Sequence, residues 1–238
     1  MTMRTDPSDV ARIFDAEVRD PGALEGLGPR YNVAPTQPIE VVVQRDDGRF
    51  LELHRWGLVP AWAKSLAVGS RMINARAETL ATSSAFRASF LRRRCVIPAD
   101  GFYEWRRTGE SGRVKEPFLI HAPDDRPLAF AGLWAPWKDP ASGEWVLSAA
   151  VVTTKANETV AQLHDRMPVI LAPDAWRLWA DPEIRDPDLL ADLLRPAADD
   201  LLELVPVSSR VNNANNEGPE LLLAPTPRAS EPELTLFS

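Results

Sequence analysis

Near the middle of the chain stands the octet Pro98-Ala99-Asp100-Gly101-Phe102-Tyr103-Glu104-Trp105, which follows the short apolar run Cys95-Val96-Ile97. Together the two stretches predict a strand, a turn and a second strand. Glu104 is flanked by two aromatic side chains, so it lies either on the solvent face of a strand or partly out of water. In the second case its pKa rises, and Glu104 becomes a candidate acid or base near neutral pH.

The composition is that of an ordinary globular protein. Hydrophobic residues make up 45% and charged residues 26% of the 238 residues, enough for one large domain or two small ones. The 22 prolines are spread along the chain, so we expect many short elements. No apolar run approaches the ~20 residues that span a bilayer, and the first residues lack an apolar signal-peptide core. The single cysteine excludes an internal disulfide and fits a reducing compartment, so we expect a cytoplasmic protein.

The formal net charge is −7 at pH 7, which argues against broad binding to nucleic acids. The charges are unevenly distributed, because basic residues dominate between Arg71 and Lys115 while acidic residues are concentrated from Asp181 to Asp200. A local basic face on an acidic protein can still hold a few phosphates. The alternative, for a run such as Arg92-Arg93-Arg94, is a set of solvated side chains on a helix.

Alternating apolar residues and turn signals predict an α+β fold, in which an antiparallel, β-rich core carries short peripheral helices. Asp47-Gly48 marks a hairpin, and Asp6 followed by Pro7 marks the start of a helix. The predicted strands cover residues 39–43, 51–55, 95–105 (two strands around a turn), 118–121, 128–134, 145–153 and 202–205. Besides the helix after Asp6, the predicted helices cover residues 79–82, 85–91, 157–163, 174–180 and 188–194.

The chain shows no internal repeat and no clear linker, which favours one domain over two. We expect that domain to cover residues 1–223, with a polar hairpin loop at residues 108–115. From Ala224 onward the chain has little potential to form a core, so residues 224–238 are predicted to be a disordered tail.

Few side chains are candidates for chemistry. The three histidines have no metal-binding spacing, and the chain has neither a glycine-rich phosphate loop nor a Gly-x-Ser-x-Gly motif, so no metal or cofactor is predicted. His164 lies at a predicted helix-to-strand junction, where side chains often reach a site, although a structural role is the alternative. An acid–base pair of Glu104 and His164 is a hypothesis that spacing cannot test. Cys95 lies among apolar residues and is predicted to be a buried, inert thiol.

Five motifs occur in order along nearly the whole chain, to about Leu223. They are Tyr31-Asn32-Val33-Ala34-Pro35, Trp56-Gly57-Leu58-Val59-Pro60-Ala61-Trp62, Ile73-Asn74-Ala75-Arg76-Ala77-Glu78-Thr79, Arg94-Cys95-Val96-Ile97-Pro98-Ala99-Asp100-Gly101-Phe102-Tyr103-Glu104-Trp105 and His164-Asp165-Arg166-Met167-Pro168. Each motif is weak by itself, but the ordered set resembles the SOS-response-associated peptidase (SRAP) family, the abasic-site shielding proteins.

The resemblance implies a SRAP fold with a barrel-like core, and single-stranded DNA containing abasic sites as the partner. In that family a Cys becomes the N-terminus after the initiator Met is removed. Its α-amine attacks the ring-opened sugar aldehyde to give a Schiff base, and its thiol then closes a thiazolidine ring. This is covalent catalysis, and it needs the amine and the thiol in their deprotonated forms.

The resemblance also implies roles for residues of this chain. Asn74 would orient the α-amine, Glu104 would move protons and His164 would assist sugar opening and imine chemistry. Arg76 and Arg166 would hold phosphates beside the lesion. Aromatic residues can support exposed bases. The residues that the resemblance places along the DNA-facing cleft are Asn32, Pro35, Trp62 and Trp105.

The start of the chain departs from the family pattern. Members begin Met-Cys-Gly-Arg-Phe, whereas this chain begins Met1-Thr2-Met3-Arg4 and reads from Thr2 onward like the family sequence just after that Phe. The nucleophile and a DNA-contacting Arg are among the four missing residues. We expect a short start, because every other motif residue is in place; loss of the cross-linking group is the alternative. Thr2, exposed by removal of Met1, could condense with an aldehyde, but the product would be a more labile oxazolidine.

Three functions follow as hypotheses. The first is a monomeric enzyme that cross-links itself to abasic sites in DNA, with the lyase and autopeptidase (hydrolase) activities of the family. The second is a non-covalent binder of damaged single-stranded DNA. The third is a cysteine hydrolase that uses Cys95 with His164, and the apolar surroundings of Cys95 argue against it.

Overall fold

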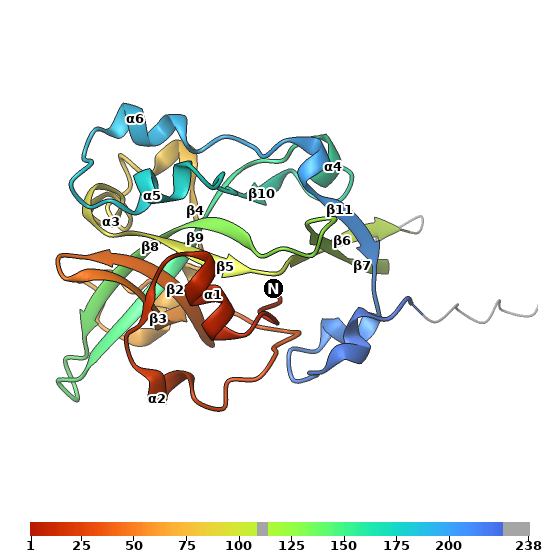
Figure 1. Cartoon of the computed structure of the whole chain (residues 1–238), viewed down its shortest axis with the longest axis horizontal. Helices are drawn as coiled ribbons and strands as arrows, with labels where there is room; N and C mark the ends of the chain where they lie inside the picture. The colour runs from red at the N-terminus through yellow and green to blue at the C-terminus, as the bar shows by residue number, and fades with distance from the viewer. Residues whose placement is uncertain (109–113, 226–238) are drawn as a thin grey trace, which may run out of the picture.

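Five strands close into a barrel at the centre of the structure, a computed structural model that describes residues 1–108 and 114–225 (Figure 1). Four antiparallel pairings join neighbouring strands, and a parallel pair closes the barrel, with Arg55 opposite Ser148 and Trp56 opposite Ala149. In barrel order the strands are β3 (Gly48–Trp56), β2 (Pro38–Arg45), β5 (Arg94–Ala99), β8 (Leu128–Lys138) and β9 (Trp145–Lys155).

Both sides of the barrel wall are buried, which explains the nearly continuous apolar runs of its strands. Alternate residues of a strand point to opposite sides. Val41 and Val43 therefore pack with Cys95 in one buried cluster, whereas Val42 packs with Val96 in another. Full burial of one such apolar side chain stabilises the folded protein by about 1.5–3 kcal/mol. A shift of one residue in a strand would exchange the side chains of the two clusters, so both clusters fix the register of the barrel.

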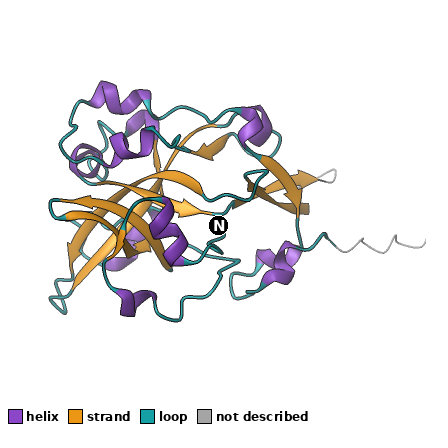
Figure 2. Ribbon diagram, in the orientation of Figure 1, coloured by secondary structure: helices purple, strands orange, loops and turns teal. Residues whose placement is uncertain are grey.

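Short helices cover the cluster that contains Val42 and Val96, on the outside of the barrel. Figure 2 shows these helices as purple segments around the strands. Their apolar residues, among them Phe14, Phe90 and Trp179, pack against the barrel wall. Prolines and aspartates begin several of these helices, as the sequence predicts for the helix after Asp6. The helices are α1 (Pro7–Ile13), α2 (Pro21–Leu24), α3 (Arg87–Arg92), α4 (Glu158–Ala161), α5 (Ala175–Ala180) and α6 (Pro187–Asp192).

A buried arginine fastens two of these helices to the barrel. The guanidinium of Arg94, at the start of β5, donates hydrogen bonds to main-chain oxygens on α3 and on the segment around α5. Burial lowers the pKa of Arg94 to about 10. The four oxygens that accept from Arg94 belong to Phe90, Trp179, Asp181 and Ile184.

A second, three-stranded antiparallel sheet extends from one end of the barrel. The turn at Asp100-Gly101 leads from β5 directly into it, so the predicted strand–turn–strand is confirmed. In sheet order its strands are β11 (Glu203–Pro206), β7 (Val114–His121) and β6 (Phe102–Thr108). This sheet carries Glu104 on β6 at the mouth of the barrel.

Several short elements complete the described chain. Three strands and five short segments of 3-10 helix lie between the longer elements, and no helix in the described ranges is long and apolar enough to cross a membrane. These elements are β1 (Glu17–Val18), η1 (Leu66–Arg71), β4 (Asn74–Arg76), η2 (Ala77–Thr79), β10 (Arg166–Pro168), η3 (Asp199–Leu201), η4 (Ser209–Asn212) and η5 (Pro219–Leu222).

The predicted α+β fold with a barrel-like core and short helices is confirmed. The predicted helix at residues 79–82 is wrong, because only a 3-10 turn forms at Ala77–Thr79. The hydroxyls of Thr79 and Thr82 each donate to a main-chain oxygen three residues back, which competes with a regular helix. The predicted tail lies outside the described residues from 226 onward, and so does the centre of the predicted loop, 109–113.

Two glycines let the barrel wall close beside β9. Gly57 adopts φ +123° and its N–H donates to the oxygen of Ala149, and a Cβ at Gly57 would lie 2.5 Å from the oxygen of Gly69.

Gly57→Ala is therefore expected to lower the free energy of unfolding by about 3 kcal/mol or more, from backbone strain and overpacking. Equilibrium unfolding in urea measures the loss. Gly143 is the matched control, since it has φ +77° with nothing near its Cβ position; Gly143→Ala is expected to lose only about 1 kcal/mol. If both variants lose the same free energy of unfolding, the close approach of Gly57 to Gly69 does not limit the residue at position 57.

Candidate functional site

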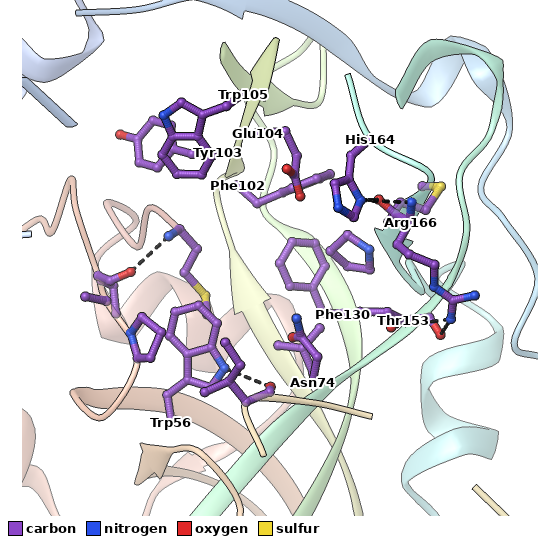
Figure 3. A pocket seen from close by; sticks show the side chains of 18 of the residues that line it. Trp56, Asn74, Phe102, Tyr103, Glu104, Trp105, Phe130, Thr153, His164 and Arg166 are labelled. Atoms are coloured by element: carbon purple, nitrogen blue, oxygen red, sulfur yellow. Dashed lines mark hydrogen bonds between the residues drawn. The ribbon is translucent and has the colours of Figure 1, made fainter. Parts of the chain in front are cut away.

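A cavity of about 640 Å³ opens where the barrel meets the second sheet (Figure 3). Its walls come from segments far apart in the sequence, from the first residue to the turn at Asn212. Among the residues predicted for the site, only Trp62 is absent from this lining. The predicted residues that do line the cavity are Asn32, Pro35, Asn74, Arg76, Glu104, Trp105, His164 and Arg166.

Glu104 projects from β6 into this cavity and is partly buried. Burial raises its pKa, while the nearby His164 and a main-chain hydrogen bond from Trp105 act in the opposite direction. In Figure 3 the carboxyl group of Glu104 lies beside the ring of His164. The structure thus favours the interpretation of Glu104 as a partly desolvated carboxyl, whose raised pKa makes it a candidate acid or base.

His164 follows α4, and its main-chain N–H donates to the oxygen of Val160 in that helix. The main-chain N–H of Arg166 donates to Nδ1 of His164 over 3.0 Å. The neutral ring therefore carries its proton on Nε2. The carboxylate of Asp165 also lies 3.3 Å from Nδ1. The predicted pair of Glu104 and His164 is thus brought together, with the tautomer of His164 set by its own loop.

Two short strands beside β9 supply the polar groups at another wall. In β4, Asn74 pairs with Val151 and Arg76 with Thr153, so both side chains reach the cavity rim. Arg166 begins β10, which pairs with the same end of β9. The guanidinium of Arg166 forms a bidentate ion pair with Glu78, with Nη1 2.6 Å from Oε1 and Nη2 2.9 Å from Oε2. The sequence predicted no role for Glu78.

Aromatic rings form much of the remaining wall, and their polar atoms are already bonded. The indole N–H of Trp56 donates to the oxygen of Ile73 (3.0 Å), and that of Trp105 to Oδ1 of Asn212 (2.7 Å). The hydroxyl of Tyr103 donates to the oxygen of Tyr31 (2.6 Å). The ring surfaces facing the cavity are thus left to make apolar contacts, together with Phe102 and Phe130.

Asn32 braces the wall formed by the C-terminal loop. Its side chain is buried, and its Nδ2 lies within 3.1–3.3 Å of the main-chain oxygens of Val211, Asn213 and Asn216. The contacts show that Asn32 and the loop at residues 211–216 hold one another, a role that the sequence did not predict for Asn32. Asn32 also lines the cavity, so a DNA-facing role for it stays a prediction.

The first residue of the chain also lines the cavity. Thr2 pairs with Gly101 and Met3 with Arg30, which fixes the N-terminal segment between two loops. The nitrogen of Met1 donates to the oxygen of Val33 over 3.0 Å, and burial lowers the pKa of this amine to about 5. A residue joined to Met1 therefore starts at the cavity wall.

Two candidate residues lie elsewhere. Trp62 is 57% exposed on the loop after β3, away from the cavity lining. Cys95 is fully buried in the barrel, and burial raises the pKa of its thiol, as expected for an inert cysteine. Among the described residues, no group of three or more His, Cys, Asp or Glu side chains is placed to hold a metal ion.

Comparison with known proteins identifies the family of this chain. The sequence model of the family described as "SOS response associated peptidase (SRAP)" matches residues 1–214. The chain belongs to the SRAP family. "Abasic site processing protein YoqW" of Bacillus subtilis is 43% identical over 194 residues, covering 82% of this chain and 85% of that protein. "Abasic site processing protein YedK" of Escherichia coli is 34% identical over 212 residues, covering 87% of this chain and 90% of that protein.

Solved structures share the SRAP fold of this chain. A protein from Bacteroides thetaiotaomicron superposes with a TM-score of 0.83 at 23% identity, covering 94% of this chain and 97% of that one. A phage-related protein from Bordetella bronchiseptica superposes with a TM-score of 0.66 at 28% identity, covering 87% and 92% of the two chains. The first of these likenesses concerns the fold alone, because the identity is low.

If Asn32 braces the C-terminal loop, Asn32→Ala will remove the side-chain donor that the main-chain oxygens of Val211 and Asn216 share, whereas the oxygen of Asn213 keeps the N–H of Asn216. The free energy of unfolding is expected to fall by about 1–3 kcal/mol, and amide hydrogen exchange across residues 211–216 is expected to accelerate. Asn215→Ala, an exposed asparagine in the same loop, serves as the control and is expected to change neither. If amide hydrogen exchange across residues 211–216 is unchanged in Asn32→Ala, Asn32 does not stabilise the C-terminal loop.

Burial of Glu104 makes a prediction about pH. A carboxyl whose pKa is raised by folding costs stability once the unfolded form ionises, above its ordinary value of 4.5. This loss of folding free energy grows as the pH rises from 4.5 to above the raised pKa of the folded protein, and it is constant at higher pH. Glu104→Gln is therefore expected to be as stable as the parent below about pH 4.5 and more stable at neutral pH. Urea unfolding across this range measures the difference; a variant less stable at neutral pH than at acid pH, relative to the parent, would contradict the prediction.

Proposed function

We propose that this SRAP protein processes abasic sites in single-stranded DNA by forming a covalent link to them. In a form that carries the family's Cys-Gly-Arg-Phe start ahead of Thr2, the reacting groups are the amine and thiol of that Cys. One observation carries the proposal: Met1, whose nitrogen donates to the oxygen of Val33, lines the cavity that also contains Asn74, Glu104 and His164. The relatives named abasic site processing proteins support it.

The geometry leaves room for such a start. With Phe in the place of Met1, three residues precede it, and three residues reach at most ~10 Å when extended. The cavity of about 640 Å³ can hold this short segment together with a sugar, because part of its wall is open to solvent at Trp105 and Asn212.

The proposed reaction balances without a cofactor. The neutral α-amine adds to the C1′ aldehyde of the ring-opened deoxyribose and gives a carbinolamine. The carbinolamine loses its hydroxyl as water and becomes an imine. The thiolate then adds to the imine carbon while the imine nitrogen takes up a proton, which closes the thiazolidine. One water is released overall, and no oxidant or reductant is needed.

The cavity offers residues for two of the proton transfers and one for orienting the amine. Glu104, whose pKa is raised by burial, protonates the departing hydroxyl of the carbinolamine. His164 donates from Nε2 to the ring oxygen of the sugar and so assists ring opening. Asn74 orients the amine from the opposite wall. In a start that still carries Met ahead of Cys, the same groups serve removal of that Met, the proposed self-processing.

DNA is held by two kinds of contact in this proposal. Arg76 and Arg166 face the phosphates at the cavity rim, and Trp105 and Pro35 give apolar surface to the neighbouring sugar and base. The site binds a single strand, because a lesion within a duplex could not enter a cavity bordered by aromatic side chains without being turned out of the stack. Because Arg76 and Arg166 contact phosphates in this proposal, binding of DNA is expected to weaken as the salt concentration is raised.

The hypothesis of a cysteine hydrolase based on Cys95 has no support in the structure. Cys95 is fully buried, its thiol pKa is raised, and it is not part of the cavity that contains His164. A hydrolase would need the two side chains within reach of one substrate atom.

A denaturing gel tests the proposal. Single-stranded DNA carrying one abasic site is incubated with the chain that begins at Met1 and with a form that begins Met-Cys-Gly-Arg-Phe-Thr2. A heat-stable shift only in the second form is the expected result. Within that form, Glu104→Gln and His164→Gln are each expected to slow the shift by about 10²–10⁴-fold, the usual contribution of general acid–base groups.

The controls separate chemistry from binding. A form with Ser in place of the added Cys keeps the amine and loses the thiol, so it is expected to give an imine that borohydride traps and that otherwise reverses. Salt-dependent binding without an adduct in any form would refute the covalent proposal and favour a non-covalent binder of damaged DNA.

A further inference from the structure

The ion pair between Glu78 and Arg166 joins two segments that line the site. Glu78 closely follows β4, the strand that carries Asn74 and Arg76, and Arg166 begins β10 two residues after His164. Nη1 of Arg166 lies 2.6 Å from Oε1 of Glu78, and Nη2 lies 2.9 Å from Oε2. A bidentate pair of this kind fixes the orientation of the guanidinium as well as its position.

A third contact ties the pair to the barrel. Nη2 of Arg166 also donates to the main-chain oxygen of Thr153 over 2.7 Å, a contact drawn in Figure 3. Thr153 of β9 is the residue that pairs with both Arg76 of β4 and Pro168 of β10. The guanidinium therefore links β9 and β10 to the 3-10 turn η2, which directly follows β4.

The main chain of Arg166 acts on His164. Its N–H donates to Nδ1 of His164 over 3.0 Å, which leaves the proton of the neutral ring on Nε2. Two acceptors compete for the opposite tautomer, since Oδ1 of Asp165 and the main-chain oxygen of Arg166 each lie 3.3 Å from Nδ1. Glu104 is the other carboxyl group beside the ring. Which tautomer is present therefore depends on where the N–H of Arg166 is held.

We propose that Glu78 is a positioning residue for the abasic-site reaction. By fixing the guanidinium of Arg166 to β9, Glu78 holds the Arg166 N–H against Nδ1 and so presents Nε2–H of His164 to the cavity. The inference rests on the proposed function, in which His164 acts as a proton donor. Glu78 is outside the cavity lining, so it acts through Arg166 rather than on the DNA. Arg166 lowers the pKa of Glu78, so the pair persists at neutral pH.

The ring nitrogens of His164 give the first readout, in the chain as it stands. ¹⁵N NMR at a pH well above about 6.5, where imidazole is neutral, reports which nitrogen carries the proton. The parent protein is expected to show Nε2–H. Glu78→Gln, which keeps the volume and removes the charge, and Glu78→Ala are expected to show a mixture of tautomers or mainly Nδ1–H. The same tautomer in the parent and in Glu78→Gln would overturn the proposal.

The rate of cross-linking gives the second readout, in the form that begins Met-Cys-Gly-Arg-Phe. At saturating abasic-site DNA, Glu78→Gln is expected to slow the reaction by about 10–100-fold, with the Kd for undamaged single-stranded DNA nearly unchanged. A weaker Kd with an unchanged rate at saturation would assign Glu78 to the grip on phosphate and overturn the positioning role.

The matched control is Glu183→Gln. Glu183 forms an exposed ion pair with Arg185 at 3.2 Å, away from the cavity lining, so its loss is expected to change neither the tautomer nor the rate. Thermal melting of each variant identifies any loss of folding, in which case Glu78→Gln is compared at a temperature where it is folded. If the parent form makes no cross-link, the proposed function fails, while the tautomer of His164 still decides the role of Glu78.

Discussion

The hydrogen bonds of strand β9 are the constraint on which the rest of the structure depends. β9 pairs with β8 and β10 as antiparallel partners and with β3 and β4 as parallel partners. The pair with β3 closes the barrel, and the pairs with β4 and β10 bring Asn74 and His164 to one cavity. Register is fixed in each pairing because a shift by one residue would exchange buried and exposed side chains. The small, fully buried Ala149 and Ala150 let the partners pack closely around this strand.

The site keeps a carboxyl group where water solvates it poorly. Tyr103 and Trp105 flank Glu104 on β6, and burial raises the pKa of Glu104. Such a group opposes folding when it is ionised, and the large apolar clusters of the barrel offset this. Placing the carboxyl on a strand next to the turn at Asp100-Gly101 holds it more rigidly than a free loop would, which suits a group that must meet a reacting atom.

Both ends of the described chain contribute to the cavity. The N-terminal segment pairs with Gly101 and Arg30, which sets the position of Met1, and the C-terminal loop is held by Asn32 and by the bond from Trp105 to Asn212. These contacts join residues that are distant in sequence, so the cavity exists only once the whole domain has folded. Pairings of such long range are slow to form, because chain entropy is lost before they stabilise the fold.

The sequence by itself determined the β-rich composition, most of the strands, the start of the first helix and the residues of the five ordered motifs. Local patterns suffice for these, because alternation and turn residues report which side of a strand is buried. The same patterns misplaced the helix at residues 79–82, where threonine hydroxyls bond to the main chain. Only the tertiary structure decided that Glu104 and His164 lie together, that Trp62 lies apart and that Glu78 holds Arg166. Each of these depends on strand register and barrel closure, which bring distant residues together and which no local pattern encodes.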